Sequence, residues 1–193
     1  PKNHLILSCD YKAFEPRILA YEFEDPEMMR IFSSEQDFHS ATAERLGISR
    51  TQAKEVNHAV AYGKSATTLA EDLNQPYQFA EVILNEYDNT YKVFAKRKSE
   101  LIRQARQTKQ LSTRGGRTRY FQREPEGYRD TQAVNTIAQG TAGDIFFAAL
   151  GNLPEWLHPF IIHSAHDEIL MCLSESEINL SLIHISEPTR PVM

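Results

Sequence analysis

The segment HLILSCDY, residues 4–11, is a short apolar run that ends in a carboxylate, and a similar pattern returns far along the chain as FIIHSAHDEILMCL, residues 160–173. Short apolar runs bounded by polar residues are typical of buried strands. We expect one strand that ends at Asp10, and a hairpin of two strands, 160–163 and 169–173, with Asp167 at its turn. A sheet built from these three strands requires Asp10 and Asp167 to lie side by side.

The region between these strands has the residue spacing of helices. Apolar residues recur at intervals of three and four positions, which places them on one helix face. Ser49 is a favourable N-cap and Gly63 a favourable end for the helix between them. Gly115-Gly116 indicates a hairpin, and Gly140 and Gly143 predict that another backbone approaches a later helix. We expect helices over 15–32 with a break at Asp25-Pro26, 37–45, 49–62, 67–73, 77–107 as one or two, and 130–150.

These elements predict an α+β fold: a small antiparallel sheet that carries the carboxylates, with a mainly helical lobe inserted between its strands. The chain has 193 residues, of which 41% are hydrophobic, enough for a core. It contains no run of about 18 apolar residues, and the opening PKNH is no signal peptide, so we expect a cytoplasmic protein without membrane contact. Cys9 and Cys172 are then interpreted as buried, reduced thiols.

Positive charge is concentrated in one part of the chain, although the formal net charge is −5. Twelve cations lie between residues 92 and 129, against three glutamates, at 100, 124 and 126. A local basic surface matters more for nucleic-acid binding than the total charge. A solvated helix face explains residues 92–109 equally well. The cations are Lys92, Lys96, Arg97, Lys98, Arg103, Arg106, Lys109, Arg114, Arg117, Arg119, Arg123 and Arg129.

Four residues at four-residue spacing form a stripe on the helix predicted over 49–62. They are Arg50, Lys54, His58 and Tyr62, two cations followed by two rings. Arginine binds phosphate as a fork, whereas lysine acts as a mobile point charge that can also protonate a leaving group. The stripe therefore suits a triphosphate at one end and a sugar and base at the other.

The carboxylates predicted to meet in the sheet suit a pair of metal ions. Asp10 and Asp167 can bridge two Mg²⁺ ions roughly 3.5–4 Å apart, the arrangement used for in-line phosphoryl displacement. Magnesium needs few carboxylates when substrate phosphates supply further oxygens. Glu168 is a candidate outer ligand. We expect two Mg²⁺ ions as the cofactor.

Several segments together resemble the fingers and palm of family A DNA polymerases, the bacterial polymerase I and phage type. The segment DYKAFEPR at 10–17 resembles motif A, residues 50–63 resemble motif B, and AHDE at 165–168 resembles motif C. DFHSAT at 37–42 and residues 135–144, which contain QGTA, agree. Because these segments occur in the family's order, we infer a DNA-templated DNA polymerase that binds primer-template DNA and dNTPs, and we expect a monomer in a bacterial cell or a phage-infected host.

The resemblance implies a role for each matching residue in catalysis and sugar selection. Asp10 and Asp167 would ligate the catalytic metals, with help from the Tyr11 carbonyl. Glu15, beside Tyr62, would exclude a ribose 2′-hydroxyl.

The resemblance also implies the contacts with the triphosphate and with DNA. Arg50, Lys54 and His39 would hold the incoming triphosphate. Asn135, Gln139 and His166 would lie along the primer and template, and the basic hairpin would contact the DNA backbone. The DNA-binding residues expected are Arg17, Arg114, Arg117, Arg119, Asn135, Gln139 and His166.

Three positions depart from the family pattern. His58 stands where the family has Phe or Tyr, so the handling of 3′-deoxy nucleotides is the property most affected, and we expect the imidazole to stack beside the sugar. Pro16 replaces an aliphatic residue. Thr131 occupies a position usually held by Arg, which weakens a DNA contact unless Arg129 compensates.

The resemblance also divides the chain. Residues 1–36 correspond to the palm strand with motif A and the helices after it, 37–110 to the fingers, and 111–180 to palm with the basic hairpin, a helix and the motif C hairpin. The chain begins just before motif A, so we expect a fragment without the thumb. Residues 181–193, SLIHISEPTRPVM, resemble translated sequencing adapter and are interpreted as a non-native tail.

Two other functions agree with part of the sequence pattern. A single-subunit phage-type RNA polymerase shares the Arg/Lys/Tyr-Gly helix, but the bulky acidic gate at Glu15 opposes ribonucleotides, and Glu168 agrees with the DNA enzymes. A catalytically inactive DNA-binding remnant would use residues 92–129, and the presence of both Asp10 and Asp167 argues against it. From the isolated chain we expect weak, salt-sensitive DNA binding and little or no processive synthesis.

Overall fold

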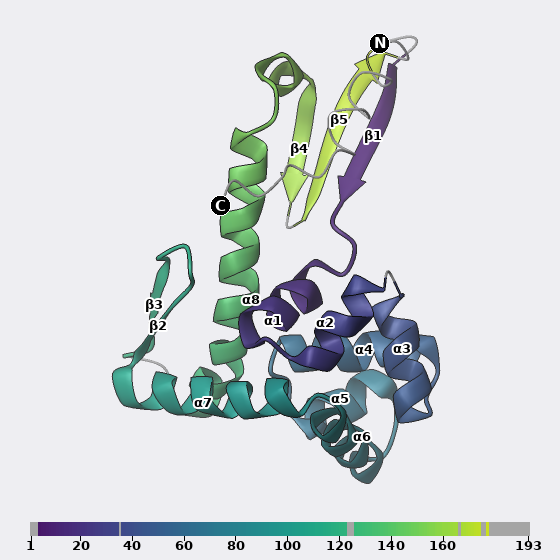
Figure 1. Cartoon of the computed structure of the whole chain (residues 1–193), viewed down its shortest axis with the longest axis vertical. Coiled ribbons are helices and arrows are strands. Elements are labelled where there is room, and N and C mark those ends of the chain that lie inside the picture. The colour runs from purple at the N-terminus through teal and green to yellow at the C-terminus, as the bar shows by residue number, and fades with distance from the viewer. Residues whose placement is uncertain (1–3, 35, 123–125, 166, 175–176, 178–193) are drawn as a thin grey trace. The chain divides into compact units, whose positions relative to one another are not determined.

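The computed structural model describes the chain except for residues 1–3, 35, 123–125, 166, 175–176 and 178–193, and the side chains of 126–129 (Figure 1). It forms two compact units. The first consists of Pro1–Lys12 and Ile145–Met193, and the second is Ala13–Asp144. The chain after Lys12 therefore groups with the helices that follow it, and the N-terminal strand groups with the C-terminal hairpin.

The first unit contains a three-stranded antiparallel sheet in the order β1-β5-β4 (Figure 1). Its strands are β1 (His4–Asp10), β4 (Ile161–Ala165) and β5 (Glu168–Ser174). Alternate residues of the central strand are buried, namely Ile169, Met171 and Leu173, because successive side chains of a strand point to opposite faces. The 3₁₀ helix η1 (Glu155–Phe160) contributes the buried Leu157. The predicted sheet is confirmed, with both hairpin strands slightly longer than expected.

The register of β1 against β5 brings two distant carboxylates together. Asp10 pairs with Glu168 and Cys9 with Ile169 along the ladder. Beyond the ladder, the Tyr11 backbone N–H donates to the Asp167 carbonyl oxygen at 3.3 Å. The ladder therefore ends at the residues that the motifs predict to bind metal.

The second unit is mainly helical. Its core contains the buried aromatic residues Phe23, Phe38, Tyr87, Tyr91 and Phe94, whose rings contact one another. The helix expected over 77–107 is two helices, which meet at Tyr91. The elements are α1 (Phe14–Phe23), α2 (Pro26–Ser33), α3 (Phe38–Leu46), α4 (Arg50–Ala61), α5 (Ala66–Leu73), α6 (Tyr77–Thr90), α7 (Lys92–Thr108), β2 (Gln110–Ser112), β3 (Thr118–Tyr120) and the first part of α8 (Glu126–Gly151).

A buried carboxylate joins two of these helices. Asp25 is only 1% exposed and is the N-cap of α2, where its Oδ1 accepts from the backbone N–H groups of Glu27 and Met28. Its Oδ2 accepts from the N–H of Phe94, in the first turn of α7, at 3.0 Å. Helix starts leave N–H groups without intrahelical partners, so one side chain satisfies both ends. The break expected at Asp25-Pro26 is thus also a tertiary contact.

Helix α4 has a capped start and two different faces. Ser49 and Gln52 form a reciprocal capping box at its N-terminus. Its buried face carries Ala53, Val56 and Val60, while Arg50, Lys54 and His58 are exposed on the other. Three residues of the predicted stripe are therefore exposed on the second unit, and the fourth, Tyr62, is the half-buried C-cap of the helix.

Gly63 follows the end of this helix at a position where both the backbone conformation and the space require glycine. Its φ is +64°, and a Cβ there would lie 2.7 Å from the carbonyl oxygen of Thr131 on α8. Backbone cannot move aside as a flexible side chain can. The helix end and α8 therefore pack closely because residue 63 has no side chain.

The approach predicted at Gly140 is made by a side chain, so the prediction of a backbone is wrong. A Cβ at Gly140 would lie 2.7 Å from the Thr113 Cγ2 atom, and one at Gly143 would have only an ordinary contact with Arg117. Thr113 is held by a 2.8 Å hydrogen bond from its hydroxyl to Asp144. The hairpin therefore docks on α8 through side chains, which glycine spacing alone cannot distinguish from backbone packing.

Gly63 and Gly47 provide a matched pair of substitutions. Both have φ of +64°, but a Cβ at Gly47 would have nothing within 4 Å. We expect Gly47→Ala to cost about 1 kcal/mol of unfolding free energy, from left-handed backbone strain alone. Gly63→Ala adds a backbone clash, so we expect about 3 kcal/mol in total. Urea denaturation monitored by circular dichroism measures both, and equal losses would show that α8 does not press on Gly63.

Candidate active site

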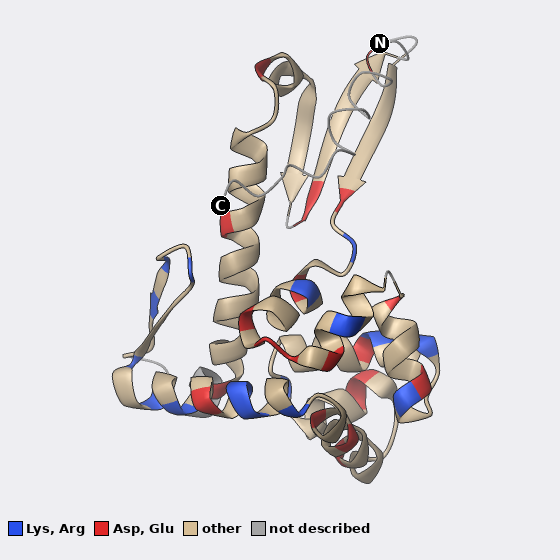
Figure 2. Ribbon diagram, in the orientation of Figure 1, with Lys and Arg blue, Asp and Glu red and all other residues tan. Residues whose placement is uncertain are grey.

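The candidate metal carboxylates lie at the adjoining ends of β1 and β5, where Figure 2 shows acidic residues. The carboxyl groups of Asp10 and Asp167 are close enough to share a hydrogen bond. Partial burial, followed by the charges of Asp167 and Glu168, raises the pKa of Asp10 above its ordinary value. Like charges held this close favour a bound cation, which would relieve their repulsion.

Glu168 is oriented by a neighbour that the motifs do not include. The hydroxyl of Ser8 donates to its carboxylate Oε1 at 2.6 Å. No group of three or more His, Cys, Asp or Glu side chains in the described part of the chain has a metal-binding arrangement. Asp10 and Asp167 are thus the two carboxylates that lie together here, and the side chain of Glu168 is bonded to Ser8.

Arg50 is anchored to a carboxylate on the preceding helix. Its Nε and Nη2 donate to the two oxygens of Asp37 at 3.0 and 3.1 Å. Asp37 is also the N-cap of α3, where it accepts from the Ser40 backbone N–H. The arrangement fixes one edge of the guanidinium and leaves its remaining N–H groups, on Nη1 and Nη2, available to a ligand.

His39 is held neutral beside this ion pair. Burial, the largest cause, lowers its pKa, and the charges of Arg50 and Lys54 lower it further against the opposing charge of Asp37. Its Nδ1 lies 3.0 Å from the amide nitrogen of Asn57, which can only donate. The imidazole therefore carries its proton on Nε2, as a hydrogen-bond donor.

The predicted sugar gate forms a chain of hydrogen bonds within the second unit. The hydroxyl of Tyr62 donates to Glu15 at 3.0 Å and accepts from the Gln139 amide at 3.1 Å. The ring of His58 lies against that of Tyr62, with centroids 4.3 Å apart. Glu15, Tyr62, His58 and Gln139 are thus neighbours, as the motifs predict for the first two.

The cations expected to contact DNA have partners within the second unit. Arg17 lies over the ring of Phe32, with its guanidinium 4.7 Å from the ring centroid. The hairpin arginines donate to α1 and α8 as follows: Arg114 to Glu22, Arg117 to Asp144 and Arg119 to Gln132. The Asn135 side chain has a buried oxygen with no hydrogen-bond partner in the described structure. His166, the tail at 181–193 and the side chain of Arg129 lie outside the described residues.

The chain also matches known proteins over most of its length. A family model described as DNA polymerase family A matches residues 1–187. The chain belongs to DNA polymerase family A. DNA polymerase I of Caldicellulosiruptor bescii is 31% identical over 189 residues, which cover 88% of this chain and 22% of that protein. DNA polymerase I of Deinococcus radiodurans is 32% identical over 187 residues, which cover 86% and 19%.

A solved family A structure has the same fold. It is described as the POL domain of Pol1 from M. smegmatis in complex with DNA primer-template and dNTP. The TM-score is 0.84 at 26% sequence identity, over 96% of this chain and 36% of that chain. This chain therefore spans about a fifth of the curated relatives' length and about a third of the solved domain.

Three residues that hold site side chains were not singled out from the sequence. They are Ser8, Asp37 and Asn57, which contact Glu168, Arg50 and His39. Asp37 falls inside the family A segment DFHSAT and has the sequence signature of an N-cap, so its position was detectable. Its ion pair was not, because Arg50 is 13 residues away and a loop sets their separation.

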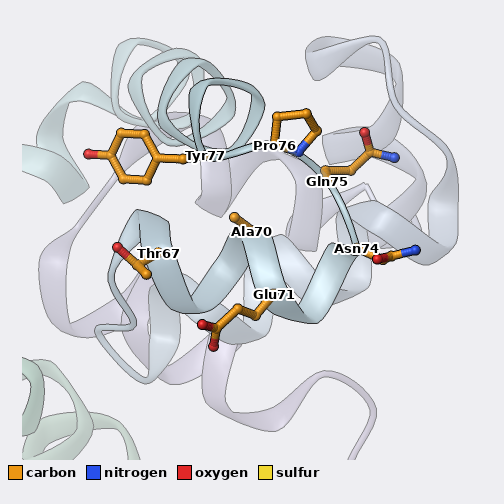
Figure 3. Close-up of a pocket in the computed structure, with 7 residues that line it drawn as sticks. All are labelled: Thr67, Ala70, Glu71, Asn74, Gln75, Pro76 and Tyr77. Atoms are coloured by element: carbon orange, nitrogen blue, oxygen red, sulfur yellow. The ribbon is translucent and has the colours of Figure 1, made fainter.

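A pocket in the second unit is separate from these groups. It has a volume of about 360 Å³ and lies at the α5–α6 connection (Figure 3). Its lining residues are Thr67, Ala70, Glu71, Asn74, Gln75, Pro76 and Tyr77, none of which has a motif role. None of the helices in the described ranges combines the length and apolar character needed to span a bilayer.

The Asp37–Arg50 pair makes stability depend on pH in a defined direction. Arg50 holds the pKa of Asp37 well below its usual range. The contribution of the pair is therefore complete above the unfolded-state pKa, about 3.9, and is lost as pH falls through the lower folded-state value. Asp37→Asn keeps an N-cap but removes the charge.

We expect Asp37→Asn to lower the thermal unfolding midpoint at pH 7, and the difference from the unmodified chain to shrink as pH falls below about 4. Arg50→Gln removes the same pair from its other side and should show the same pH dependence. Scanning calorimetry at pH 7, 5 and 3 measures both. A difference that stays constant over this range would contradict the role of the ion pair.

Proposed function

We propose that this chain is the catalytic part of a polymerase that carries out DNA-templated DNA synthesis, joining a dNTP to a primer 3′-hydroxyl. One observation carries the proposal: in a family A chain, the β1–β5 ladder ends with the carboxyl groups of Asp10 and Asp167 within hydrogen-bonding distance. Two convergent carboxylates, one of them (Asp10) with a raised pKa, are expected where cations bind. The M. smegmatis relative, whose complex contains DNA primer-template and dNTP, supports the choice of substrates.

Two magnesium ions fit the donor set in this proposal. Asp10 and Asp167 supply hard carboxylate oxygens, and Mg²⁺ commonly takes only one or two carboxylates together with water and substrate phosphates. Tyr11 would add its carbonyl oxygen, and Glu168 would act as an outer ligand through water. When bound, the ions would lower the pKa of the attacking hydroxyl and neutralise the leaving pyrophosphate.

The triphosphate is assigned to the start of α4. Arg50 would bind a phosphate through the guanidinium edge that Asp37 leaves available, and His39 would donate from Nε2. Lys54, one turn further on, is exposed and is the candidate general acid. In the proposed reaction, the primer 3′-hydroxyl would lose its proton to solvent water as its oxygen bonds to the α-phosphorus. The bond to the bridging oxygen of pyrophosphate would break, and Lys54 would give a proton to pyrophosphate.

The sugar is assigned to the group around Tyr62. Glu15 accepts from the Tyr62 hydroxyl, so its carboxylate is held in one position. A fixed, bulky anion beside the sugar would leave no room for a 2′-hydroxyl, which favours dNTPs over rNTPs. The ring of His58 supplies the adjoining surface, in the position where the family has Phe or Tyr.

Single-nucleotide addition tests the proposed reaction. With the chain in excess over a primer-template and Mg²⁺ present, we expect slow addition of the complementary dNMP. Asp10→Asn and Asp167→Asn should each reduce the rate at least about 100-fold, because a metal ligand contributes several kcal/mol to transition-state stabilisation.

Glu155→Gln is the matched control, since it removes an exposed carboxylate of the same unit from η1. Rapid-quench sampling and gel electrophoresis measure the rates. Addition that persists in Asp167→Asn at the unmodified rate would refute a catalytic role for the carboxylate pair.

Replacing Glu15 tests the assignment of the sugar gate. We expect Glu15→Ala to raise the ratio of rNTP to dNTP incorporation by at least about 10-fold, the effect of relieving roughly 1.4 kcal/mol of exclusion. Tyr62→Phe keeps the ring but removes the hydrogen bond that fixes Glu15, so its ratio should rise less. Parallel single-nucleotide assays with GTP and dGTP give the ratios. An unchanged ratio in Glu15→Ala would assign sugar selection elsewhere.

A further inference from the structure

The basic helix α7 carries two kinds of cation. Some are neutralised by neighbouring carboxylates: Arg97 by Glu100, Lys98 by Asp88 and Arg106 by Asp130. Within the described part of the chain, Lys92, Lys96 and Arg103 have no such partner. All three are exposed.

The three uncompensated cations form a single file. At 100° per residue they fall within about 40° of one another around the helix, directly opposite the buried Phe94 and Ala105. Along the axis, Lys96 is about 6 Å from Lys92 and Arg103 is about 10 Å further on. We call Lys92, Lys96 and Arg103 the α7 row.

Acidic groups limit the width of this row. Glu100, bound to Arg97, lies on one flank, and Asp130, bound to Arg106, is held at the other. The positive surface between them is therefore narrow and about 16 Å long. It suits one extended anionic strand better than two strands side by side.

Helix stability does not account for the row. The N-terminal turn of a helix favours acidic residues because the helix dipole is positive there. Helix α7 has no acidic residue in its first turn and begins with Lys92 itself. Lys92 thus lies where a cation is least favourable to the isolated helix.

We propose that the α7 row binds the phosphate backbone of single-stranded DNA. The choice of DNA as the polyanion rests on the proposed function, and the choice of a single strand rests on the narrow, acid-flanked row. The contacts involve phosphates, so binding is independent of sequence and strongly dependent on salt. None of the residues assigned to metal, triphosphate or sugar belongs to the row.

The salt dependence of binding to a fluorescent oligo(dT) measures the contribution of the row. The triple variant Lys92→Gln/Lys96→Gln/Arg103→Gln removes three phosphate contacts. Each contact to a single strand contributes about 0.7 to the slope of log K against log salt, so the slope should fall in magnitude by about 2. Fluorescence anisotropy from 25 to 200 mM NaCl would measure it.

The matched control is Arg97→Gln/Lys98→Gln/Arg106→Gln, which changes the net charge equally but removes cations that are already paired. We expect it to leave the slope within about 0.5 of the unmodified chain. Equal loss of slope in both triples, no loss in the row triple, or the same loss on duplex DNA as on oligo(dT) would overturn the proposal. Matching circular dichroism and thermal midpoints establish that each triple is folded.

Two variants distinguish the proposed reaction from DNA binding by the α7 row. Asp167→Asn should abolish nucleotide addition and keep the oligo(dT) slope, whereas the row triple should retain single-nucleotide addition at saturating DNA. A variant that loses nucleotide addition but keeps the salt slope of oligo(dT) binding affects the proposed reaction and not the α7 row. Absence of oligo(dT) binding by the unmodified chain would overturn the row.

Discussion

The pairing register of β1 with β5 is the constraint on which the candidate site depends. It joins segments about 160 residues apart and ends with Asp10 opposite Glu168 and Tyr11 bonded to Asp167. Side chains alternate between the faces of a strand, so a slip of β1 by one residue against β5 would turn Asp10 to the other face of the sheet. The apolar residues that stabilise the sheet therefore also fix the position of two mutually repelling carboxylates.

In the second unit, a few polar side chains position the cations of the candidate site. Asp37 caps α3 and aligns Arg50, while Asn57 orients His39. Arg50 begins α4, where the helix dipole disfavours a cation, and the carboxylate of Asp37 offsets that cost. The supporting residues thus set the direction and protonation of groups that an anionic ligand would meet, before any ligand binds.

The sequence allowed the sheet, most helix ends and the proximity of Asp10 and Asp167 to be predicted, because these follow from local periodicity and capping residues. The Tyr62–Glu15 contact followed only from resemblance to the family. The partners of Arg114 and Arg117 could not be predicted, because Glu22 and Asp144 are 92 and 27 residues away and meet them only through tertiary packing. Gly140 signalled a close approach but could not specify that Thr113 makes it.

Ion pairs between side chains reduce the number of cations that the basic segment, residues 92–129, can offer to DNA. Along the sequence, residues 92–129 form one cationic stretch. In the structure, however, the hairpin arginines and half of the α7 cations bind side-chain oxygens of the same unit. These charges contribute to packing, and only those left without a counterion can exchange small ions for phosphates. A count of cations therefore overestimates the basic surface available to DNA. The positions of the carboxylates decide which cations remain free to bind phosphates.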